Sequence, residues 1–410
     1  MLTCFFLRLT QNEDGHFRDS DVVDVDSPHD RDLNKFRSNL QQMYPMHAEE
    51  FAHNGLLHPA PRDFQDVQSN NTLLRSFRQM VRLRQMDDIL LNAQRQGRIS
   101  FYMTSRGEEA IHMGAGSALE LGDPIFAQYR EQGLLMWRGF TLEQFTNQCF
   151  STDLDLGKGR QMPVHYGSRA LNYHTVSSPL GTQLPQAVGA AYRLKLAGKP
   201  NVAACFFGDG CASTTDFHSA LNFAATLRSP VLFFCRNNGY AISTPVVDQY
   251  AGDGIVSRAP GYGMAAIRVD GNDIFAVHAA VREARNYALE HSAPVLIEAM
   301  TYRQGHHSTS DDSTRYRCAK EVQNFADRFD PITRLGTFLK EQDWMTVDEE
   351  ATIRDEERIA VLKAMEQAEK RPKPSLDSLF EDVYDELPKH LQEQKAQLQE
   401  HIAKYPKKYQ

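Results

Sequence analysis

Two short polar turns in this 410-residue chain carry the residue types that bind a divalent cation. One is Gly208-Asp209-Gly210, and the other contains Asn237 and Asn238. Asp209 offers a carboxylate, while Asn238 and a backbone carbonyl near Tyr240 offer neutral oxygens. Mg²⁺ suits this incomplete, oxygen-only set because it takes its remaining ligands from water and phosphate. Either turn alone is common, but their joint occurrence after two apolar runs predicts a site for magnesium and a diphosphate.

A pair of histidines, His306 and His307, lies in a polar loop that follows the last apolar run of the central region. Imidazole titrates near neutral pH, so a histidine is a common general acid or base. An unplaced pair of this kind is usually a solvated loop. Its position after a predicted strand favours chemistry, and we predict His307 as the catalytic residue, with His306 shaping the loop.

The elements that must position these groups alternate between strands and helices. Apolar runs at 124–127, 202–207, 230–235, 265–269 and 294–300 predict strands, and 72–97, 214–227 and 273–291 predict helices. This alternation predicts an α/β fold with a mostly parallel sheet covered by helices on both faces. In such sheets ligands bind beyond the carboxyl ends of the strands, where all the polar groups named above would converge.

The flanking regions differ from this centre. Residues 1–71 have little periodicity and are predicted to form an amino-terminal arm, partly disordered; 72–317 are the diphosphate-binding α/β domain. Residues 318–410 are predicted to be a helical extension that packs on the same domain or on a partner. Within that extension Thr346 and Glu349 have the spacing of a capping box opening a helix to about Lys370.

Composition excludes several classes of function. The net charge of −8 argues against a nucleic-acid surface. No apolar stretch reaches the roughly 18 residues of a membrane helix. The six cysteines form no C-x-x-C pair, which disfavours a zinc site or disulfide framework. A magnesium-dependent nucleotide-binding protein should carry a glycine-rich phosphate loop, and the sequence has none.

The Gly-Asp-Gly turn followed by Asn-Asn resembles the thiamine diphosphate signature. The wider sequence resembles the alpha subunits of branched-chain 2-oxo acid dehydrogenases, also called 2-oxoisovalerate dehydrogenases, over about 72–388. The matching blocks are 98–104, 128–131, 157–166, 177–180, 234–244 and 305–312. The branched-chain enzymes often carry Glu where this chain has Asp209. Pyruvate or acetoin dehydrogenase alpha subunits remain the alternative, and a non-catalytic subunit of the same fold is disfavoured because the polar site is intact.

The resemblance implies the following site residues. The predicted cofactor contacts are Tyr129, Arg130, Ser178, Leu180, Gly208, Asp209, Gly210, Arg236 and His307. The predicted magnesium ligands are Asp209, Asn238 and Tyr240, and the predicted potassium ligands are Ser177, Pro179, Thr182 and Gln183. The predicted substrate pocket draws on Phe101, Tyr102, Gln128 and Leu180, although Phe101 and Tyr102 could equally be ordinary core.

Regulation, partners and compartment also follow from the resemblance. Ser308 matches an inhibitory phosphorylation site, which implies a kinase, whereas a second family serine falls at Cys318. Thiamine catalysis needs a glutamate from a second α/β domain, and one sheet accounts for 72–317. We therefore expect a beta subunit in an alpha2-beta2 assembly, a lipoyl acyltransferase as acceptor, and the mitochondrial matrix as location. The first twelve residues alone make a weak presequence.

Overall fold

The computed structural model describes residues 70–408. The predicted amino-terminal arm thus lies outside the described residues, apart from its last two positions, which begin the first described helix. Among the described helices, none combines the length and apolar character needed to cross a bilayer.

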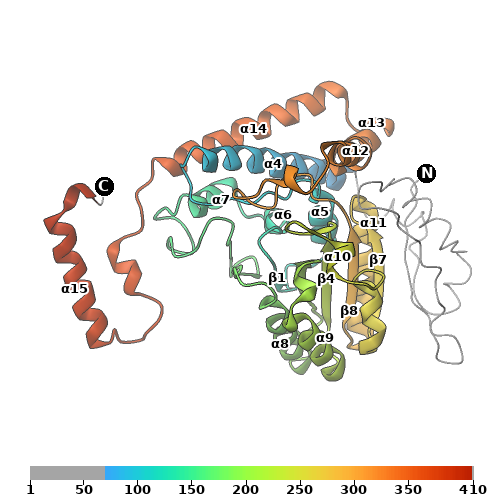
Figure 1. The fold of residues 1–410 in the computed structure, drawn as a ribbon, viewed down its shortest axis with the longest axis horizontal. Helices are drawn as coiled ribbons and strands as arrows, with labels where there is room; N and C mark the ends of the chain where they lie inside the picture. Colours follow the sequence, from blue (N-terminus) through green and yellow to red (C-terminus); the bar gives the residue numbers. More distant parts are fainter. Residues whose placement is uncertain (1–69, 409–410) are drawn as a thin grey trace, which may run out of the picture.

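A six-stranded parallel sheet forms the centre of the molecule, in the order β2-β1-β3-β4-β8-β7 (Figure 1). Its strands are β1 (Ile125–Phe126), β2 (Tyr173–His174), β3 (Ala203–Gly208), β4 (Val231–Asn237), β7 (Ala265–Asp270) and β8 (Val295–Met300). The five predicted strands are confirmed. The sixth, β2, was not predicted because it lies in the polar segment 172–175, whereas the equally short β1 lies in an apolar run. A separate two-stranded ribbon pairs β5 (Tyr240–Ala241) with β6 (Thr244–Pro245).

Helices cover both faces of this sheet, as predicted. The α-helices are α4 (Asn70–Arg95), α5 (Glu109–Ala118), α6 (Gln132–Trp137), α7 (Leu142–Cys149), α8 (Gln183–Leu196), α9 (Thr215–Leu227), α10 (Val246–Gln249), α11 (Ile274–His291), α12 (Ala319–Phe329), α13 (Pro331–Glu341), α14 (Val347–Glu369) and α15 (Lys389–Lys404). Short 3-10 helices are η1 (Cys211–Ser213), η2 (Val256–Tyr262), η3 (Ser313–Arg315), η4 (Leu376–Phe380) and η5 (Pro406–Lys408).

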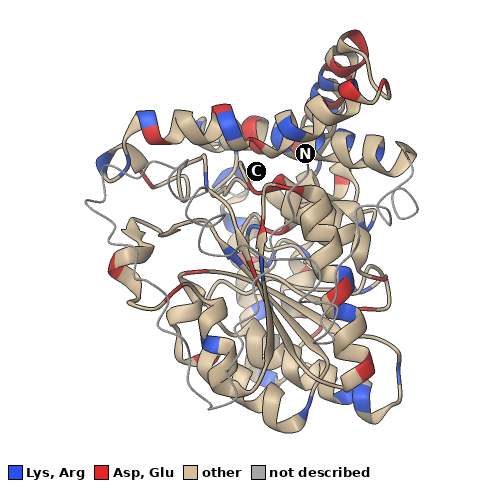
Figure 2. Cartoon of the chain, turned by 90° about the vertical axis from the view of Figure 1, so that its right-hand side faces the viewer, with Lys and Arg blue, Asp and Glu red and all other residues tan. Residues whose placement is uncertain are grey.

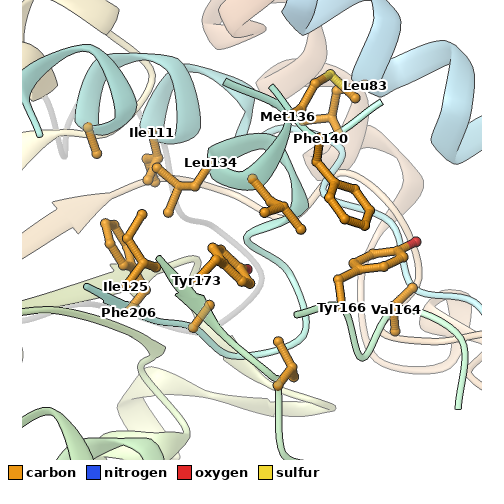
Figure 3. Packing of buried hydrophobic residues seen from close by; sticks show 14 of the residues in the cluster. Leu83, Ile111, Ile125, Leu134, Met136, Phe140, Val164, Tyr166, Tyr173 and Phe206 are labelled. Carbon is orange, nitrogen blue, oxygen red and sulfur yellow. The ribbon is translucent and has the colours of Figure 1, made fainter. Parts of the chain in front are cut away.

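Alternating side chains of the strands supply two separate cores. Phe206 points into the core under α5, α6 and α11, part of which is drawn in Figure 3, whereas Phe207 points into the core under α8 and α9. This period of two is the pleat of a strand buried on both faces. It explains why the strands are continuous apolar runs rather than alternating patterns.

The carboxyl-terminal extension joins the same body through its first three helices. α14 lies along α4 in Figure 1, and its Val361 and Ala364 belong to the larger core. α13 contributes Leu335 and Leu339 to a third core with α4 and α5. The predicted capping box is confirmed, because Thr346 accepts from the Glu349 amide and the Glu349 side chain accepts from the Thr346 amide. α15 stands away from the body in Figure 1 and has no buried residue.

Charged residues are spread over the outer helices. In the view of Figure 2, lysines and arginines alternate with aspartates and glutamates along the helices at the top of the molecule. Many of these side chains form exposed ion pairs, such as Arg98 with Glu369 and Lys370 with Glu366. Pairs of this kind contribute little to stability.

Candidate active site

The candidate site lies where the order of the strands reverses. The chain leaves β1 for β2 on one side and leaves β3 for β4 on the other. In open α/β sheets the crevice that binds ligands lies at such a point, here beyond the carboxyl ends of β1 and β3. Tyr129 and Arg130 follow β1, while Gly208 and Asp209 end β3. Gln128 ties the two ends together, because its Oε1 accepts from the Gly208 amide at 3.0 Å.

The two polar turns predicted to share a cation are in contact. β3 and β4 are neighbours, with Gly208 opposite Arg236. A Cβ atom added to Gly210 would lie 2.9 Å from the Cβ of Ala241, in the segment that follows the asparagine pair. Gly210 is thus required for the close approach of these two segments, and the shared cation stays a prediction.

Asp209 has the environment of a metal ligand. Its side chain is buried, and burial raises the pKa of its carboxyl to about 6. Gln249 Nε2 donates to Asp209 Oδ2 at 3.0 Å, but within residues 70–408 no lysine or arginine forms an ion pair with this carboxylate. A buried carboxylate held only by a neutral amide fits a bound cation, which would supply the missing positive charge.

Asn238 presents its amide with a defined orientation. Its Nδ2 donates to Glu108 Oε1 at 2.8 Å, and its Oδ1 accepts from the Tyr240 amide at 3.3 Å. Asn238 and Tyr240 are both buried. In residues 70–408 no group of three or more His, Cys, Asp or Glu side chains could hold a metal by itself. The donor set of one carboxylate and neutral oxygens therefore fits Mg²⁺ completed by phosphate and water rather than a closed protein cage.

Two buried arginines, Arg130 after β1 and Arg303 after β8, lie at the same edge of the sheet. Arg130 Nη1 donates to the Thr104 carbonyl at 2.6 Å, and Arg130 and Arg303 each place a guanidinium nitrogen 3.1 Å from His307 Nδ1. Neither arginine forms an ion pair with a carboxylate among the described residues. Burial and the nearby Arg130 lower the pKa of Arg303 to about 10. Two unpaired cations packed together fit an anionic ligand such as a diphosphate.

His307 is held by these arginines as a neutral ring. Burial, followed by the charges of Arg130 and Arg303, lowers the pKa of His307 to about 3. Because arginine nitrogens can only donate, Nδ1 must accept, so the ring proton is on Nε2. The backbone is fixed as well, since the His307 amide donates to Asp311 Oδ2 at 2.7 Å. His307 can therefore offer Nε2–H as a hydrogen-bond donor.

Arg236, predicted to lie beside the phosphates, is placed below the crevice between two carboxylates. Its Nη1 donates to Glu108 Oε2 at 2.6 Å, and its Nε donates to Glu131 Oε1. All three side chains are buried. The charge of Arg236 is thus balanced by the protein itself, in contrast to that of Arg130.

The residues predicted to bind potassium lie in the turn that precedes α8. Ser177 and Pro179 are exposed, Thr182 is half-buried and Gln183 is buried. The Thr182 hydroxyl donates to the Pro179 carbonyl at 3.3 Å, whereas Gln183 Nε2 donates to the Phe206 carbonyl at 3.2 Å. The turn therefore brings together the Pro179 and Thr182 oxygens, while the Gln183 amide is tied to the sheet.

Ser178 and Leu180, predicted to contact the cofactor, are exposed on the same turn. Ser178 Oγ lies 2.6 Å from His165 Nε2, and His165 Nδ1 lies 3.0 Å from the Pro163 carbonyl. A carbonyl only accepts, so Nδ1 carries the proton and the serine hydroxyl donates to Nε2.

Three of the residues predicted to line the substrate pocket have defined contacts within the chain. Tyr102 is fully buried in the larger core and donates its hydroxyl to Asp87 Oδ1 at 2.9 Å. Phe101 is half-buried against that core, and Gln128 is committed to Gly208. The core interpretation of Phe101 and Tyr102, left open by the sequence, is thus the one that fits their contacts.

Ser308, the predicted phosphorylation site, is half-buried in the loop that carries His307. Its carbonyl accepts from the Asp311 amide at 3.2 Å. Cys318 is exposed at the amino-terminal end of α12.

Four site residues escaped sequence reasoning: Glu108, Glu131, His165 and Arg303. Arg303 could have been found, since it follows β8 at the same edge as His307. The two glutamates gave no local signal, because their partner Arg236 is far away along the chain.

A parallel sheet with a buried carboxylate and two arginines without carboxylate partners at one edge is typical of an α/β protein that binds a diphosphate. Residues 77–377 match the family described as "Dehydrogenase E1 component", and the chain belongs to this family. The family is thiamine diphosphate-dependent, which agrees with the cofactor predicted from the two turns.

Relatives of the chain carry a consistent name. It is 54% identical over 342 residues to "2-oxoisovalerate dehydrogenase subunit alpha, mitochondrial" of Dictyostelium discoideum, covering 83% of this chain and 78% of that one. Proteins of the same name in Caenorhabditis elegans and Homo sapiens are 55% and 54% identical, covering 82% of this chain and 78% and 76% of theirs. These names agree with the branched-chain resemblance rather than with the pyruvate or acetoin alternative.

Proposed function

We propose that this chain is the alpha subunit of a thiamine diphosphate-dependent branched-chain 2-oxo acid dehydrogenase. The observation that carries the proposal is the contact between the Asp209 and Asn238 turns, with the unpaired Arg130 across the crevice. The names of the relatives support 2-oxoisovalerate and similar branched 2-oxo acids as substrates. They also support a mitochondrial location, which we assign to the matrix.

Asp209, Asn238 and the backbone carbonyl of Tyr240 would hold Mg²⁺, and Arg130 with Tyr129 would hold the diphosphate. Thiamine diphosphate supplies the carbanion chemistry by which a 2-oxo acid loses its carboxyl group. The chain's own contribution is to fix the phosphate end and to place His307 beside the reacting centre. With its proton on Nε2, His307 would donate a hydrogen bond to the substrate's oxygen during decarboxylation or acyl transfer.

A separate beta subunit would complete the site. Ser177, Ser178, Pro179 and Leu180 are exposed, although resemblance assigns the cofactor or potassium to each of them. A ligand site made of exposed residues becomes enclosed when a partner subunit covers it, and this supports an alpha2-beta2 assembly. The acyl group would then pass to a lipoyl acyltransferase. The turn before α8 would bind K⁺ through the Pro179 and Thr182 oxygens that already lie together, with Ser177 and Gln183.

Phosphorylation of Ser308 by a kinase would inhibit the enzyme. A phosphate adds about −1.5 to −2 charges next to His307 and within reach of the arginines that would otherwise hold the cofactor's anion. Asp311 and Asp312 stand in the same loop and would repel it, so the loop would have to rearrange. A Ser308→Glu variant should lose activity while Ser308→Ala retains it. Full activity of Ser308→Glu would refute this regulation.

The proposed function is tested by co-expressing the chain with its cognate beta chain and measuring decarboxylation of 3-methyl-2-oxobutanoate and pyruvate. We expect the branched acid to be preferred, and activity to require thiamine diphosphate and Mg²⁺. The matched control is Asp209→Asn, which keeps the size of the side chain but removes the charge that the cation needs. Robust turnover by the isolated chain, or a preference for pyruvate, would contradict the proposal.

A further inference from the structure

The two adjacent asparagines of the metal-binding turn are each held by a different buried glutamate. Asn237 Nδ2 donates to Glu298 Oε1 at 2.8 Å, and Asn238 Nδ2 donates to Glu108 Oε1 at 2.8 Å. Both glutamates have no exposed surface. When the nitrogen of a side-chain amide donates to a carboxylate, the amide oxygen points away from that carboxylate. For Asn238, this leaves Oδ1 on the side of the Tyr240 amide, to which it is hydrogen-bonded.

Glu108 makes a second contact that links this amide to the arginine below. Its Oε1 accepts from Asn238 and its Oε2 accepts from Arg236 at 2.6 Å. The carboxylate is placed by the chain itself, because Glu108 immediately precedes α5 (Glu109–Ala118). Glu131 also pairs with Arg236 and is equally buried, but it has no hydrogen bond with Asn238.

We propose that Glu108 is a positioning residue that sets the orientation of the Asn238 amide, so that Oδ1 rather than Nδ2 faces the divalent cation. The inference rests on the proposed function, which makes Asn238 a metal ligand. Glu108 touches neither the cation nor the reacting atoms and acts through Asn238. Partners that orient a metal ligand in this way commonly change metal affinity about 10- to 100-fold when they are removed.

The chemistry of the substitution Glu108→Gln makes the inference specific. Glutamine has one oxygen, which the Arg236 guanidinium would take because arginine can only donate. Its NH₂ group would then face the NH₂ group of Asn238, two donors without an acceptor. The relief for this clash is rotation of the Asn238 amide by half a turn, which points its nitrogen at the cation.

The test measures binding of Mn²⁺, which accepts the same oxygen ligands as Mg²⁺ and can be followed by electron paramagnetic resonance. It uses the assembled alpha-beta enzyme with saturating thiamine diphosphate. We expect Glu108→Gln to raise the Kd for Mn²⁺ about 10- to 100-fold. The matched control is Glu131→Gln, which removes an equally buried charge from Arg236 but leaves Asn238 untouched, so its Kd should stay close to the wild-type value. Equal weakening by both variants would overturn the inference.

A second variant exchanges donor and acceptor between the two residues. In Glu108→Gln combined with Asn238→Asp, the glutamine oxygen still accepts from Arg236 while its NH₂ group donates to the new aspartate. The total charge is unchanged, and a carboxylate oxygen faces the cation. We expect this double variant to bind Mn²⁺ more tightly than either single variant, because Asn238→Asp alone sets two carboxylates against each other.

This comparison also covers the case in which Glu108→Gln fails to assemble, since the double variant can be compared with Asn238→Asp alone. A double variant no better than the single ones would refute the role of Glu108. Failure of the proposed metal site itself has a different signature. In that case Asp209→Asn would leave the wild-type binding of Mn²⁺ unchanged.

Discussion

The neutral state of His307 can be tested directly. Its Nδ1 lies 3.1 Å from nitrogens of both Arg130 and Arg303, and burial together with these charges lowers its pKa to about 3. An ordinary histidine has a pKa of about 6.5, so the shift of about 3.5 pH units corresponds to about 5 kcal/mol against the imidazolium form. At pH 5 the His307 ring should be about 99% neutral, whereas a free imidazole would be only about 3% neutral.

The assay is hydrogen–deuterium exchange at the imidazole C2 position, read by tandem mass spectrometry that separates His307 from the neighbouring His306. The exchange rate follows ionisation of the ring, so its midpoint along the pH axis reports the pKa. In the alpha-beta enzyme without cofactor we expect no midpoint between pH 5 and 9. The Arg303→Met substitution removes one of the two cations and should raise the midpoint. Arg328→Met, an exposed control on α12 (Ala319–Phe329), should leave it unchanged.

Binding of thiamine diphosphate gives the experiment a second arm. Its negative charge would offset the arginines, so we expect the midpoint to rise when the cofactor is added. A wild-type midpoint near 6.5 without cofactor would refute the reasoning, because it would mean that the two guanidinium groups do not act on the ring. In that case His307 could serve as a charged acid, and its proposed role as an Nε2–H donor would have to be abandoned.

Two further predictions concern packing. Gly210→Ala should push the Asp209 turn away from Ala241 and weaken the binding of Mn²⁺ and thiamine diphosphate, measured by titration. The control is Gly261→Ala, which has open space around it and should leave both affinities unchanged. Unchanged affinities in Gly210→Ala would contradict the contact. Leu339→Ala in α13 (Pro331–Glu341) should lower the free energy of unfolding by about 2–5 kcal/mol, seen as a lower Tm of the assembled enzyme. Ile359→Ala on the exposed side of α14 should change the free energy of unfolding by less than about 0.5 kcal/mol. A loss for Leu339→Ala that is as small as this would show that α13 is not part of the core.

The strands and the polar turns were predictable from the sequence because their signals are local. Buried parallel strands such as β3 (Ala203–Gly208) and β4 (Val231–Asn237) are continuous apolar runs, and each ends in a polar turn. When these runs are aligned as parallel strands, their polar turns lie at the same edge of the sheet. By contrast β2 (Tyr173–His174) lies in a polar segment that gives no strand signal, although it pairs with β1 at the edge of the sheet.

The ion pairs beneath the site could not be predicted because they join distant parts of the chain. The family resemblance places Arg236 beside the phosphates, and this stays a prediction, but no local pattern indicated its ion pairs. The two carboxylate partners of Arg236 are Glu108 and Glu131, which lie in distant segments of the chain and are brought next to Arg236 only by folding. The same limit applies to the carboxyl-terminal helices. The sequence predicted a helical extension that packs on the same domain or on a partner, but not that α14 would lie along α4.

The distribution of charge explains why this chain would be only half of a catalytic site. Below the crevice Arg236 is paired within the protein itself, with the carboxylates of Glu108 and Glu131. In the crevice the balance is left open, because Asp209 lacks a cation and Arg130 lacks an anion among the described residues. A magnesium diphosphate would satisfy both at once, with its metal on Asp209 and its phosphate on Arg130. The turn that carries Leu180 is exposed, and under the proposed function it would contact the cofactor where the beta subunit covers it.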